Sequence, residues 1–355
     1  MVQDKLLKAA LDFRDAELWD VLDDSMVFGV KLPNDEIAYC CVMGHNGEHY
    51  ALGMYKGAEE FSSYYTTINM ADSFSMLDTL SAKATFNHIN CDFVNASNLD
   101  NPDMKDITKL YAKQNGMKVR RSHGYPDFVR YSPFQTERFE LHEEEQEWCT
   151  TCLQAATLLA RIVKNSDDPF KLGFDRDLKY PSAEGGKIVP LVIITKADGS
   201  ACFVERTKLP AYIKPKYAQI SYDNDFAAFK FKKAEHHPNF VVQCKLCFLP
   251  MAFDETKGGI SYALLTACRD QDNFMFKPVI GVSYPTSCKD SLTEMGEKLL
   301  EETDLMPTTI EVADDLTENL LKDFCKRTGI KLERVSPDKV NMDEFMFQMM
   351  AMMMR

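Results

Sequence analysis

Long apolar runs and a surplus of positive charge are both missing from this sequence. Lys and Arg number 41 against 54 Asp and Glu, so the formal net charge of the 355 residues is −13. This excess of acids repels phosphate backbones at long range, and nucleic-acid binding is therefore not expected. Because no stretch is apolar over the length that a membrane-spanning helix needs, no membrane insertion is expected either.

The best-marked catalytic motifs are also missing. The chain has no G-x-S-x-G elbow, Walker loop, H-E-x-x-H pair or Rossmann fingerprint. Their absence removes the easily recognised classes of hydrolase, nucleotide-binding enzyme and dehydrogenase. We therefore expect no cofactor, and an enzyme is the less favoured interpretation.

Several features indicate a cytoplasmic location. Residues 1–20 carry acids throughout and no small-residue cleavage site, which is unlike a secretion signal. The 11 cysteines are an odd number, spread from Cys40 to Cys325. We expect them to be reduced and packed as small apolar side chains.

The length and composition suit a soluble protein of two domains. Hydrophobic residues make up 45% of the chain and charged residues 27%, which is typical of globular proteins. Residues 166–187 are polar and rich in Gly, Pro and Asp, so the boundary is predicted near 165–185. The predicted division is a domain at 1–168, a domain at 186–340 and a Met-rich segment at 341–355.

The first domain is predicted to be α+β. Apolar residues recur at helical spacing over 4–24, which indicates one or two amphipathic helices. Three β-rich runs at 26–32, 37–44 and 49–57 are separated by turn residues and predict an antiparallel meander. The stretch 141–165 begins acidic, ends basic and repeats apolar residues, which predicts a long helix.

The second domain is predicted to be α/β. It is expected to open with a hairpin over 188–207 and to continue with strands over 239–251, 259–268 and 274–284. From 277 to 335 the pattern is strand, helix, strand, helix, strand. This alternation predicts right-handed crossovers onto a mostly parallel sheet.

Residues 43–53, MGHNGEHYALG, combine two histidines with a turn. Asn46-Gly47 between alternating runs predicts a two-residue hairpin loop, in which His45 lies opposite Glu48. The two histidines then point to opposite faces, so no metal is expected here. A phosphate-binding loop would be followed by a helix, whereas a strand is expected after this turn.

The same pairing predicts one strand face of small residues, made by Val42, Gly44, Ala51 and Gly53. A packed helix, another backbone or a ligand could approach such a face closely, and the packed helix is the simpler interpretation. The ligand alternative names Gly44, Glu48, His49 and Gly53 as candidate binding residues.

A second candidate region is RRSHGYPDFVRY at 120–131, which Pro and Gly interrupt. It supplies Arg121 and Arg130 as further candidate ligand-binding residues, because such loops often form binding edges. The favoured alternative is that its arginines bind the acidic start of the following helix, at 142–147.

The hairpin motif VMGHNGEHYALGMYKG at 42–57 resembles the start of an uncharacterised bacterial domain family of unknown function. The stretch NGMKVRRSHGYPDFVRYSP at 115–133 is similar to a segment that precedes the long helix in that family. The carboxy-terminal half, through the strand, helix, strand unit at 308–335, looks like a partner domain, also of unknown function, that often follows it. The resemblance implies an intracellular bacterial protein with two α/β-type domains, and it implies no activity.

Two C-x-x-C pairs, Cys149/Cys152 and Cys244/Cys247, have a spacing used by zinc sites. The first pair lies within the predicted long helix. The second lies in a predicted strand, where residues three apart face opposite sides. We therefore expect both pairs to be buried and not to share a metal.

Asp314 and Asp315 follow a predicted strand and open a predicted helix. The carboxyl end of a parallel strand is where α/β folds usually bind ligands. With other acids these two could hold a divalent cation, as in ribonuclease H-like hydrolases. The alternative, which we favour, is that they cap the helix and interact with its dipole.

The Met-rich segment is apolar, polarizable and nearly uncharged after Glu344. Surfaces of this kind adapt to partners, so a protein partner or self-association is expected through Met346, Phe347, Met349, Met350 and Met353. The leading functional hypothesis is a non-catalytic binding or protein-interaction module. The alternatives are a metal-dependent hydrolase with a ribonuclease H-like second domain, and a small-ligand sensor.

Overall fold

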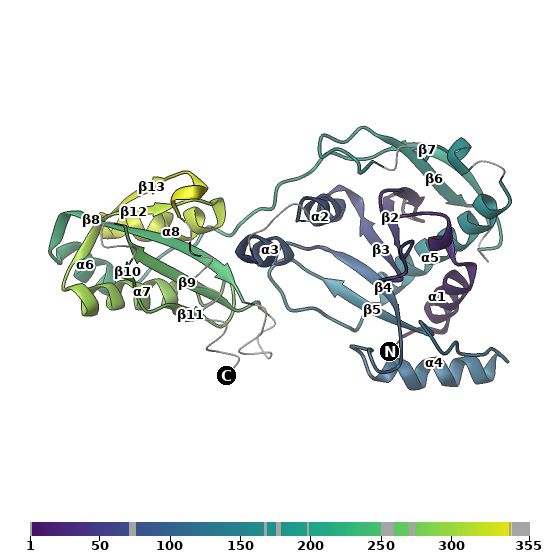
Figure 1. Cartoon of the computed structure of the whole chain (residues 1–355). Helices are drawn as coiled ribbons and strands as arrows, with labels where there is room; N and C mark the ends of the chain where they lie inside the picture. Colours follow the sequence, from purple (N-terminus) through teal and green to yellow (C-terminus); the bar gives the residue numbers. More distant parts are fainter. Residues whose placement is uncertain are drawn as a thin grey trace. The chain divides into compact units, whose positions relative to one another are not determined.

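A computed structural model describes residues 2–70, 76–166, 169–174, 179–196, 199–249, 259–269, 274–340 and 342. They form two compact units, each built on its own mixed sheet (Figure 1). Of the described residues, 2–70, 86–133 and 137–214 belong to the first unit, and the others belong to the second. The mixed α and β content confirms the predicted α+β and α/β fold class.

The first unit contains a seven-stranded sheet. Its strands in spatial order are β5 (Tyr125–Tyr131), β4 (His88–Val94), β3 (Ala51–Lys56), β2 (Ile37–Met43), β1 (Phe28–Lys31), β6 (Ile188–Ile194) and β7 (Cys202–Lys208). All neighbours are antiparallel except β1 and β6, which are parallel. The predicted three-stranded meander is confirmed as β1, β2 and β3.

The helices of the first unit cover both faces of this sheet. They are α1 (Asp4–Ala16), α2 (Gly57–Met70), α4 (Asp103–Gln114) and α5 (Glu143–Lys164), with short 3-10 turns η1 (Leu18–Asp20) and η2 (Pro169–Leu172). Helices α1 and α5 contribute to the larger core, which includes Cys40, Val42 and Leu52 of the sheet. Helix α2 packs Phe61 against Tyr39 and Tyr55 in a smaller, tyrosine-rich core.

The predicted long helix is confirmed as α5. Its first turn holds three glutamates and its last turn holds Arg161 and Lys164, charges that suit the two ends of the helix dipole. The carboxylate of Glu145 accepts the backbone N–H of His142 at 2.7 Å, which satisfies one of the donors left free at a helix start.

The second unit contains a six-stranded sheet. Its strands run β10 (Phe274–Met275), β9 (Tyr262–Cys268), β8 (His236–Phe248), β12 (Met306–Val312) and β13 (Lys331–Arg334), and β11 (Val279–Gly281) also pairs with β9. Its helices are α3 (Met76–Lys83), α6 (Asp225–Lys233), α7 (Cys288–Thr303) and α8 (Asp315–Thr328), followed by a 3-10 turn η4 (Pro337–Lys339).

The predicted strand–helix alternation is correct in its second half. Strands β12 and β13 are parallel and are connected by α8, as a crossover unit requires. Strand β11 instead pairs antiparallel with β9, and the strand beside β12 is β8. The sheet is therefore mixed, with antiparallel neighbours on one side of β8 and parallel neighbours on the other.

The hairpin over 188–207 is predicted in the second domain, whereas the structure places it in the first unit. Strands β6 and β7 extend the first sheet, because β6 pairs with β1 through Gly29–Leu191 and Val30–Val192. The units therefore divide near residue 214 instead of 165–185. A parallel pairing between strands so far apart in sequence has no local turn signal, so the boundary could not be seen from the polar stretch.

The predicted register of the β2–β3 hairpin is wrong by one residue. Met43 pairs with Ala51 and Val42 with Leu52, so the connection is a longer loop over residues 44–50. A shift by one residue moves a strand's side chains to the other face, so Val42 and Gly53 do not share the predicted small face. The ring of Tyr50 lies 5.2 Å from that of Trp19, which holds the end of the loop against the α1 core.

Candidate functional site

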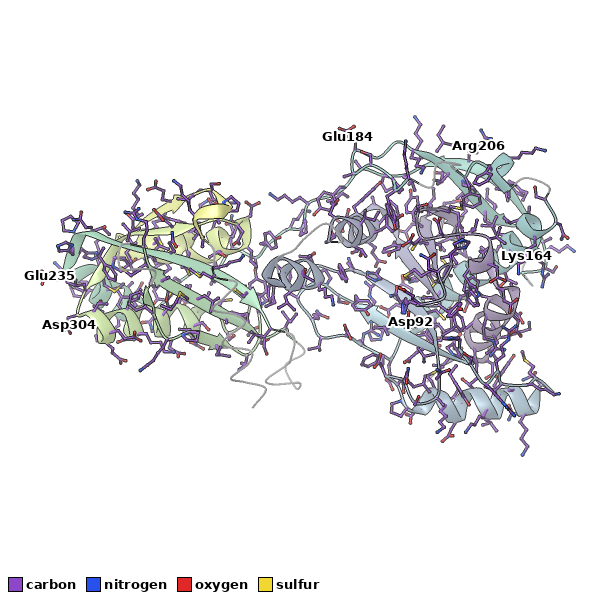
Figure 2. The ribbon with its side chains drawn as sticks, in the orientation of Figure 1. Asp92, Lys164, Glu184, Arg206, Glu235 and Asp304 are labelled. Atoms are coloured by element: carbon purple, nitrogen blue, oxygen red, sulfur yellow. The ribbon has the colours of Figure 1, made fainter. Side chains whose placement is uncertain are left out.

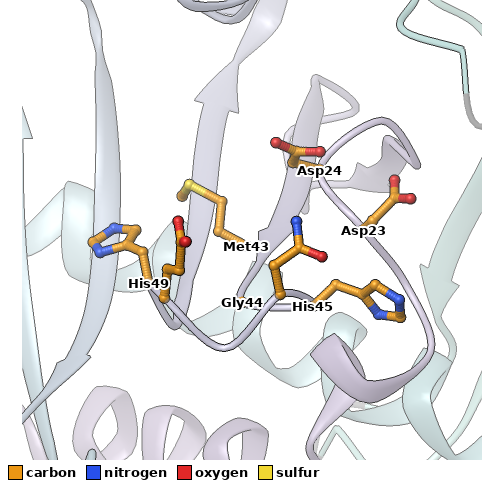
Figure 3. A pocket seen from close by; sticks show the side chains of 8 residues that line it. Asp23, Asp24, Met43, Gly44, His45 and His49 are labelled. Atoms are coloured by element: carbon orange, nitrogen blue, oxygen red, sulfur yellow. The ribbon is translucent and has the colours of Figure 1, made fainter.

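A pocket of about 190 Å³ lies where the β2–β3 loop meets the segment that precedes β1 (Figure 3). Its lining is Asp23, Asp24, Met43, Gly44, His45, Asn46, Glu48 and His49. Three carboxylates and no lysine or arginine line it, so it has a negative potential at neutral pH. A pocket of this size admits a small charged group or the end of a side chain.

Both aspartates of the pocket are held in place by hydrogen bonds. The carboxylate of Asp23 accepts the backbone N–H of Ser25 at 2.8 Å and its hydroxyl at 2.5 Å. The carboxylate of Asp24 accepts the hydroxyl of Tyr180 at 3.0 Å, and its carbonyl accepts that of Tyr64 at 2.7 Å. The negative charges are therefore positioned before any ligand arrives, which lowers the entropic cost of binding.

The two histidines of the loop have different partners, and Figure 3 shows their rings pointing away from each other. Nδ1 of His45 lies 3.0 Å from the carbonyl oxygen of Trp19. Nε2 of His49 lies 3.1 Å from Oδ1 of Asp92 on β4, and this hydrogen bond raises the pKa of His49. Among the described residues, no group of three or more His, Cys, Asp or Glu is arranged to hold a metal ion.

A second carboxylate, that of Asp127, lies next to Asp92 in the sheet. Asp92, labelled on the first sheet in Figure 2, is the direct cross-strand neighbour of Asp127 on β5. Asp127 is 1% exposed, and its Oδ2 accepts the backbone N–H of Asp100 at 2.7 Å. Its Oδ1 has no hydrogen-bond partner within the described part of the chain. Burial raises the pKa of Asp127 to about 6, and the carboxylates of Asp100 and Asp92 add to this rise.

Three of the residues predicted as ligand-binding come together in the pocket: Gly44, Glu48 and His49. Gly53 is not among them. A Cβ atom at Gly53 would lie 3.2 Å from the hydroxyl of Tyr55, so a tyrosine that packs with α2 already covers this position. Arg121 is exposed and does not line the pocket.

Arg130 has a structural role. Its Nη2 lies 2.9 Å from Oε1 of Glu60 and donates to Oδ1 of Asn87 at 2.7 Å. Its Nε lies 3.5 Å from Oε1 of Glu145 at the start of α5, and Nη2 of Arg138 lies 2.7 Å from the same oxygen. For Arg130, the favoured alternative that these arginines bind the acidic start of the long helix is therefore confirmed.

Asp314 and Asp315 have the capping and surface roles of the favoured alternative. The carboxylate of Asp314 accepts the backbone N–H of Thr317 at 2.7 Å, and its two oxygens lie 2.9 and 3.0 Å from the Thr317 hydroxyl. Asp315 forms an ion pair with Arg334 at 3.1 Å. The neighbouring strand β8 has no acidic residue, so no additional carboxylate from that strand approaches this point.

The cysteine pairs are packed as predicted. Cys149 and Cys152 lie on α5 and are buried in the larger core of the first unit. Cys244 and Cys247 belong to two different apolar clusters of the second unit. All of the cysteines are free thiols. The predicted partner residues Met346, Phe347, Met349, Met350 and Met353 lie outside the described residues.

Sequence reasoning missed two acids that line the pocket, Asp23 and Asp24, and two that lie behind His49 in the sheet, Asp92 and Asp127. A signal was present for the last two, because each is a single acid within an apolar or aromatic strand, HINCDFV and YPDFVRY. An acid at such a position is either paired or protonated. The Pro and Gly residues of this stretch predict a loop, whereas the structure has strand β5, an edge strand that tolerates Pro126.

Fold and site together define a protein of two mixed α/β domains with an acidic pocket in the first. Residues 4–177 match the family model described as Domain of unknown function (DUF7309), and residues 229–350 match Domain of unknown function (DUF6930). The two matched segments follow one another along the chain, consistent with an uncharacterised two-domain family of unknown function. No curated protein and no solved structure matches the chain. None of the helices in the described ranges has the length and apolar character to span a membrane.

Proposed function

We propose that the protein is a non-catalytic binding module of the bacterial cytoplasm, whose first domain captures a positively charged group. The observation that carries this proposal is the meeting of Asp23, Asp24 and Glu48 in one pocket that no lysine or arginine lines. Carboxylates close to a cation form strong, charge-assisted hydrogen bonds, and several of them together select for charge.

The size of the pocket indicates the kind of ligand. A volume of about 190 Å³ suits the ammonium or guanidinium end of a lysine or arginine side chain, or a small amine. The side chain of Met43 supplies an apolar part of the lining that can contact the methylene groups next to the charge. Gly44, Glu48 and His49 are the predicted ligand residues that this site uses, so the sensor hypothesis would apply to the same pocket.

Isothermal titration calorimetry tests the proposal. Nα-acetyl-lysine amide, Nα-acetyl-arginine amide and putrescine are added in turn to the full chain at low ionic strength and pH 7.5. We expect at least one of them to bind. We expect Glu48→Gln to raise its dissociation constant about tenfold, which corresponds to about 1.4 kcal/mol of binding free energy. Glu184→Gln is the matched control, because Glu184 is an exposed glutamate of the same unit outside the pocket (Figure 2). Equal affinities of Glu48→Gln and the unchanged chain would refute the proposal.

The free thiols support a cytoplasmic location. All 11 cysteines are unpaired, and all but Cys202 are buried. Disulfides are rare in reducing compartments, where buried cysteines serve as small apolar side chains. Measuring the subcellular fraction that contains the protein in its own cells checks this part of the proposal.

A second candidate function is partner binding or self-association through the Met-rich segment, with Met346, Phe347, Met349, Met350 and Met353 as the contact residues. It is supported by Val340 and Met342, which are buried in an apolar cluster with Cys247 and Leu265 of the second sheet. Met342, the last described residue before this segment, therefore lies in an apolar cluster. Deletion of residues 343–355 should change the mass of the native assembly, and an unchanged mass would remove this candidate.

The ribonuclease H-like alternative is the weakest proposal. The mixed order of the second sheet is compatible with it, because β12 and β13 are parallel to β8 while β9 is antiparallel. Metal-dependent hydrolysis, however, requires several carboxylates at one place. Asp314 accepts a hydrogen bond from Thr317, and Asp315 forms an ion pair with Arg334. Among the described residues, no group of acids is arranged around them to bind a metal ion.

A further inference from the structure

Helix α6 of the second unit has an exposed aromatic side. Phe226 is 82% exposed and Phe229 is 63% exposed, the two highest values among the exposed large hydrophobic residues described. Three residues apart on a helix, they are surface neighbours. The other side of the helix is anchored, because Phe231 is fully buried and its ring lies 6.0 Å from that of Phe324. The exposed pair therefore belongs to a well-packed helix.

Lysines flank this aromatic pair. Nζ of Lys233 lies 5.8 Å from the centre of the Phe229 ring, within the range of a cation–π contact. Lys230 is paired with Glu297, whereas Lys232 and Lys233 form no ion pair with any described residue. A surface that joins two exposed phenylalanines to Lys233, with Lys232 next along the helix and neither lysine paired within the described part of the chain, fits a ligand that carries both apolar groups and negative charge.

We infer that this side of α6 binds the segment 343–355 of a second copy of the chain. Asp343 and Glu344 are followed directly by Phe345, Met346 and Phe347, so acids for the lysines and apolar groups for the phenylalanines occur side by side in this segment. Aromatic residues and methionine are enriched in protein interfaces. The inference rests on the self-association proposed above and names the surface that would receive the segment.

A second copy fits better than the same chain. Val340 and Met342 pack with Cys247 and Leu265 on one face of β8 and β9. The buried side of α6 packs with the cluster of Cys244 on those strands, which is the other face of the sheet. Met342 thus lies on the face of the sheet opposite α6, whereas α6 of a second copy can approach from the Met342 side.

A polyanionic partner fits less well. Nucleic acid and anionic membranes both carry dense negative charge, and the chain's net charge of −13 repels them at long range. A short segment with two carboxylates needs only the local charges of Lys232 and Lys233. The combination of an acidic chain and one basic, aromatic helix side therefore favours a peptide with few acids.

Sedimentation equilibrium of the full chain tests the inference. Phe226→Ser combined with Phe229→Ser should raise the dissociation constant of the dimer at least tenfold. Phe203→Ser is the matched control, because Phe203 is 45% exposed on β7 of the first unit and should leave the constant unchanged. A dimer that resists the double substitution would overturn the placement on α6, whereas a wild-type chain that is monomeric throughout would overturn self-association itself.

Charge reversal separates a specific contact from a general loss of apolar surface. Lys232→Glu with Lys233→Glu should weaken the dimer at least tenfold, and so should Asp343→Lys with Glu344→Lys. Mixing the two reversed proteins should restore association between them, because the reversed charges complement each other in trans. Failure of the mixture to associate more tightly than either protein alone would overturn the inference.

Discussion

Asp92 of β4 and Asp127 of β5 are direct cross-strand neighbours, and His49 is paired with the first of them at 3.1 Å. Like charges opposite each other in a sheet are destabilising, and this pair is also largely removed from water. Burial, followed by the carboxylates of Asp100 and Asp92, raises the pKa of Asp127 to about 6. The fold therefore holds a carboxyl group that ionises near neutral pH, at the cost of stability.

Asp127→Asn should consequently stabilise the protein at neutral pH. Between pH 3.8 and about 6 the folded chain keeps a proton that the unfolded chain has released, so its stability falls as the pH rises through this window. About two pKa units correspond to roughly 3 kcal/mol at most, so we expect a gain of about 1–3 kcal/mol at pH 7.5. The gain should be near zero at pH 4. Urea unfolding at both pH values measures it, and a gain of equal size at the two values would contradict the assignment.

His49 should titrate at a lower pH after Asp92→Asn. The hydrogen bond with Asp92 raises the pKa of His49, so the pair stabilises the fold below the ordinary imidazole pKa of 6.5, and this contribution is lost as the pH rises through the raised value. Protonated His49 also adds positive charge to the pocket lining, so cation binding should weaken as the pH falls. The ring signals of His49 in an NMR titration measure its midpoint, and cation titrations at two pH values measure the change in affinity.

The parts of the fold that could be predicted are those fixed by neighbours in sequence. The meander of β1 to β3, the charge pattern of α5 and the cap of α8 each depend on residues within a few positions of one another. Gly329 directly follows α8 and has a φ of +80°. This is the left-handed conformation that a glycine at the end of a helix predicts. Local chemistry was enough to place these elements.

The parts that could not be predicted depend on contacts between distant segments. The parallel pairing of β1 with β6 joins residues near 30 and 190, and no turn signal marks it. The one-residue register error at the hairpin arose because Tyr50 packs against Trp19 instead of entering the ladder. The acidic site was missed for the same reason, since Asp23, Asp92 and Asp127 lie far apart in the chain. The sequence pointed only to Gly44, Glu48 and His49, because these three share one loop.

Asp314→Ala should destabilise the second unit by about 1–2 kcal/mol, the usual cost of removing a helix cap. The carboxylate holds both the backbone N–H and the hydroxyl of Thr317 at the start of α8. Asp315→Ala should cost less, because its ion pair with Arg334 is partly exposed and such pairs contribute little. Urea unfolding compares the two variants. Titration of Mg²⁺ adds a check: if the unchanged chain bound the ion and Asp314→Ala did not, the capping role would be incomplete and the hydrolase alternative would return.

Gly53→Leu should unfold the α2 side of the first sheet instead of blocking a ligand. A Cβ at this position would lie 3.2 Å from the hydroxyl oxygen and 3.3 Å from Cε2 of Tyr55, so a leucine side chain must displace that ring. Tyr55 packs edge-on against Phe61 and Tyr64 of α2, at 5.8 and 6.0 Å, and overpacking of a core costs about 1–3 kcal/mol or more. Gly53→Ala adds a single methyl group and should cost less, which provides a graded control.

Urea unfolding and cation titration on the same samples measure both properties. A Gly53→Leu protein with unchanged stability and abolished cation binding would show that the ligand site includes Gly53, against the placement of the pocket at Gly44, Glu48 and His49.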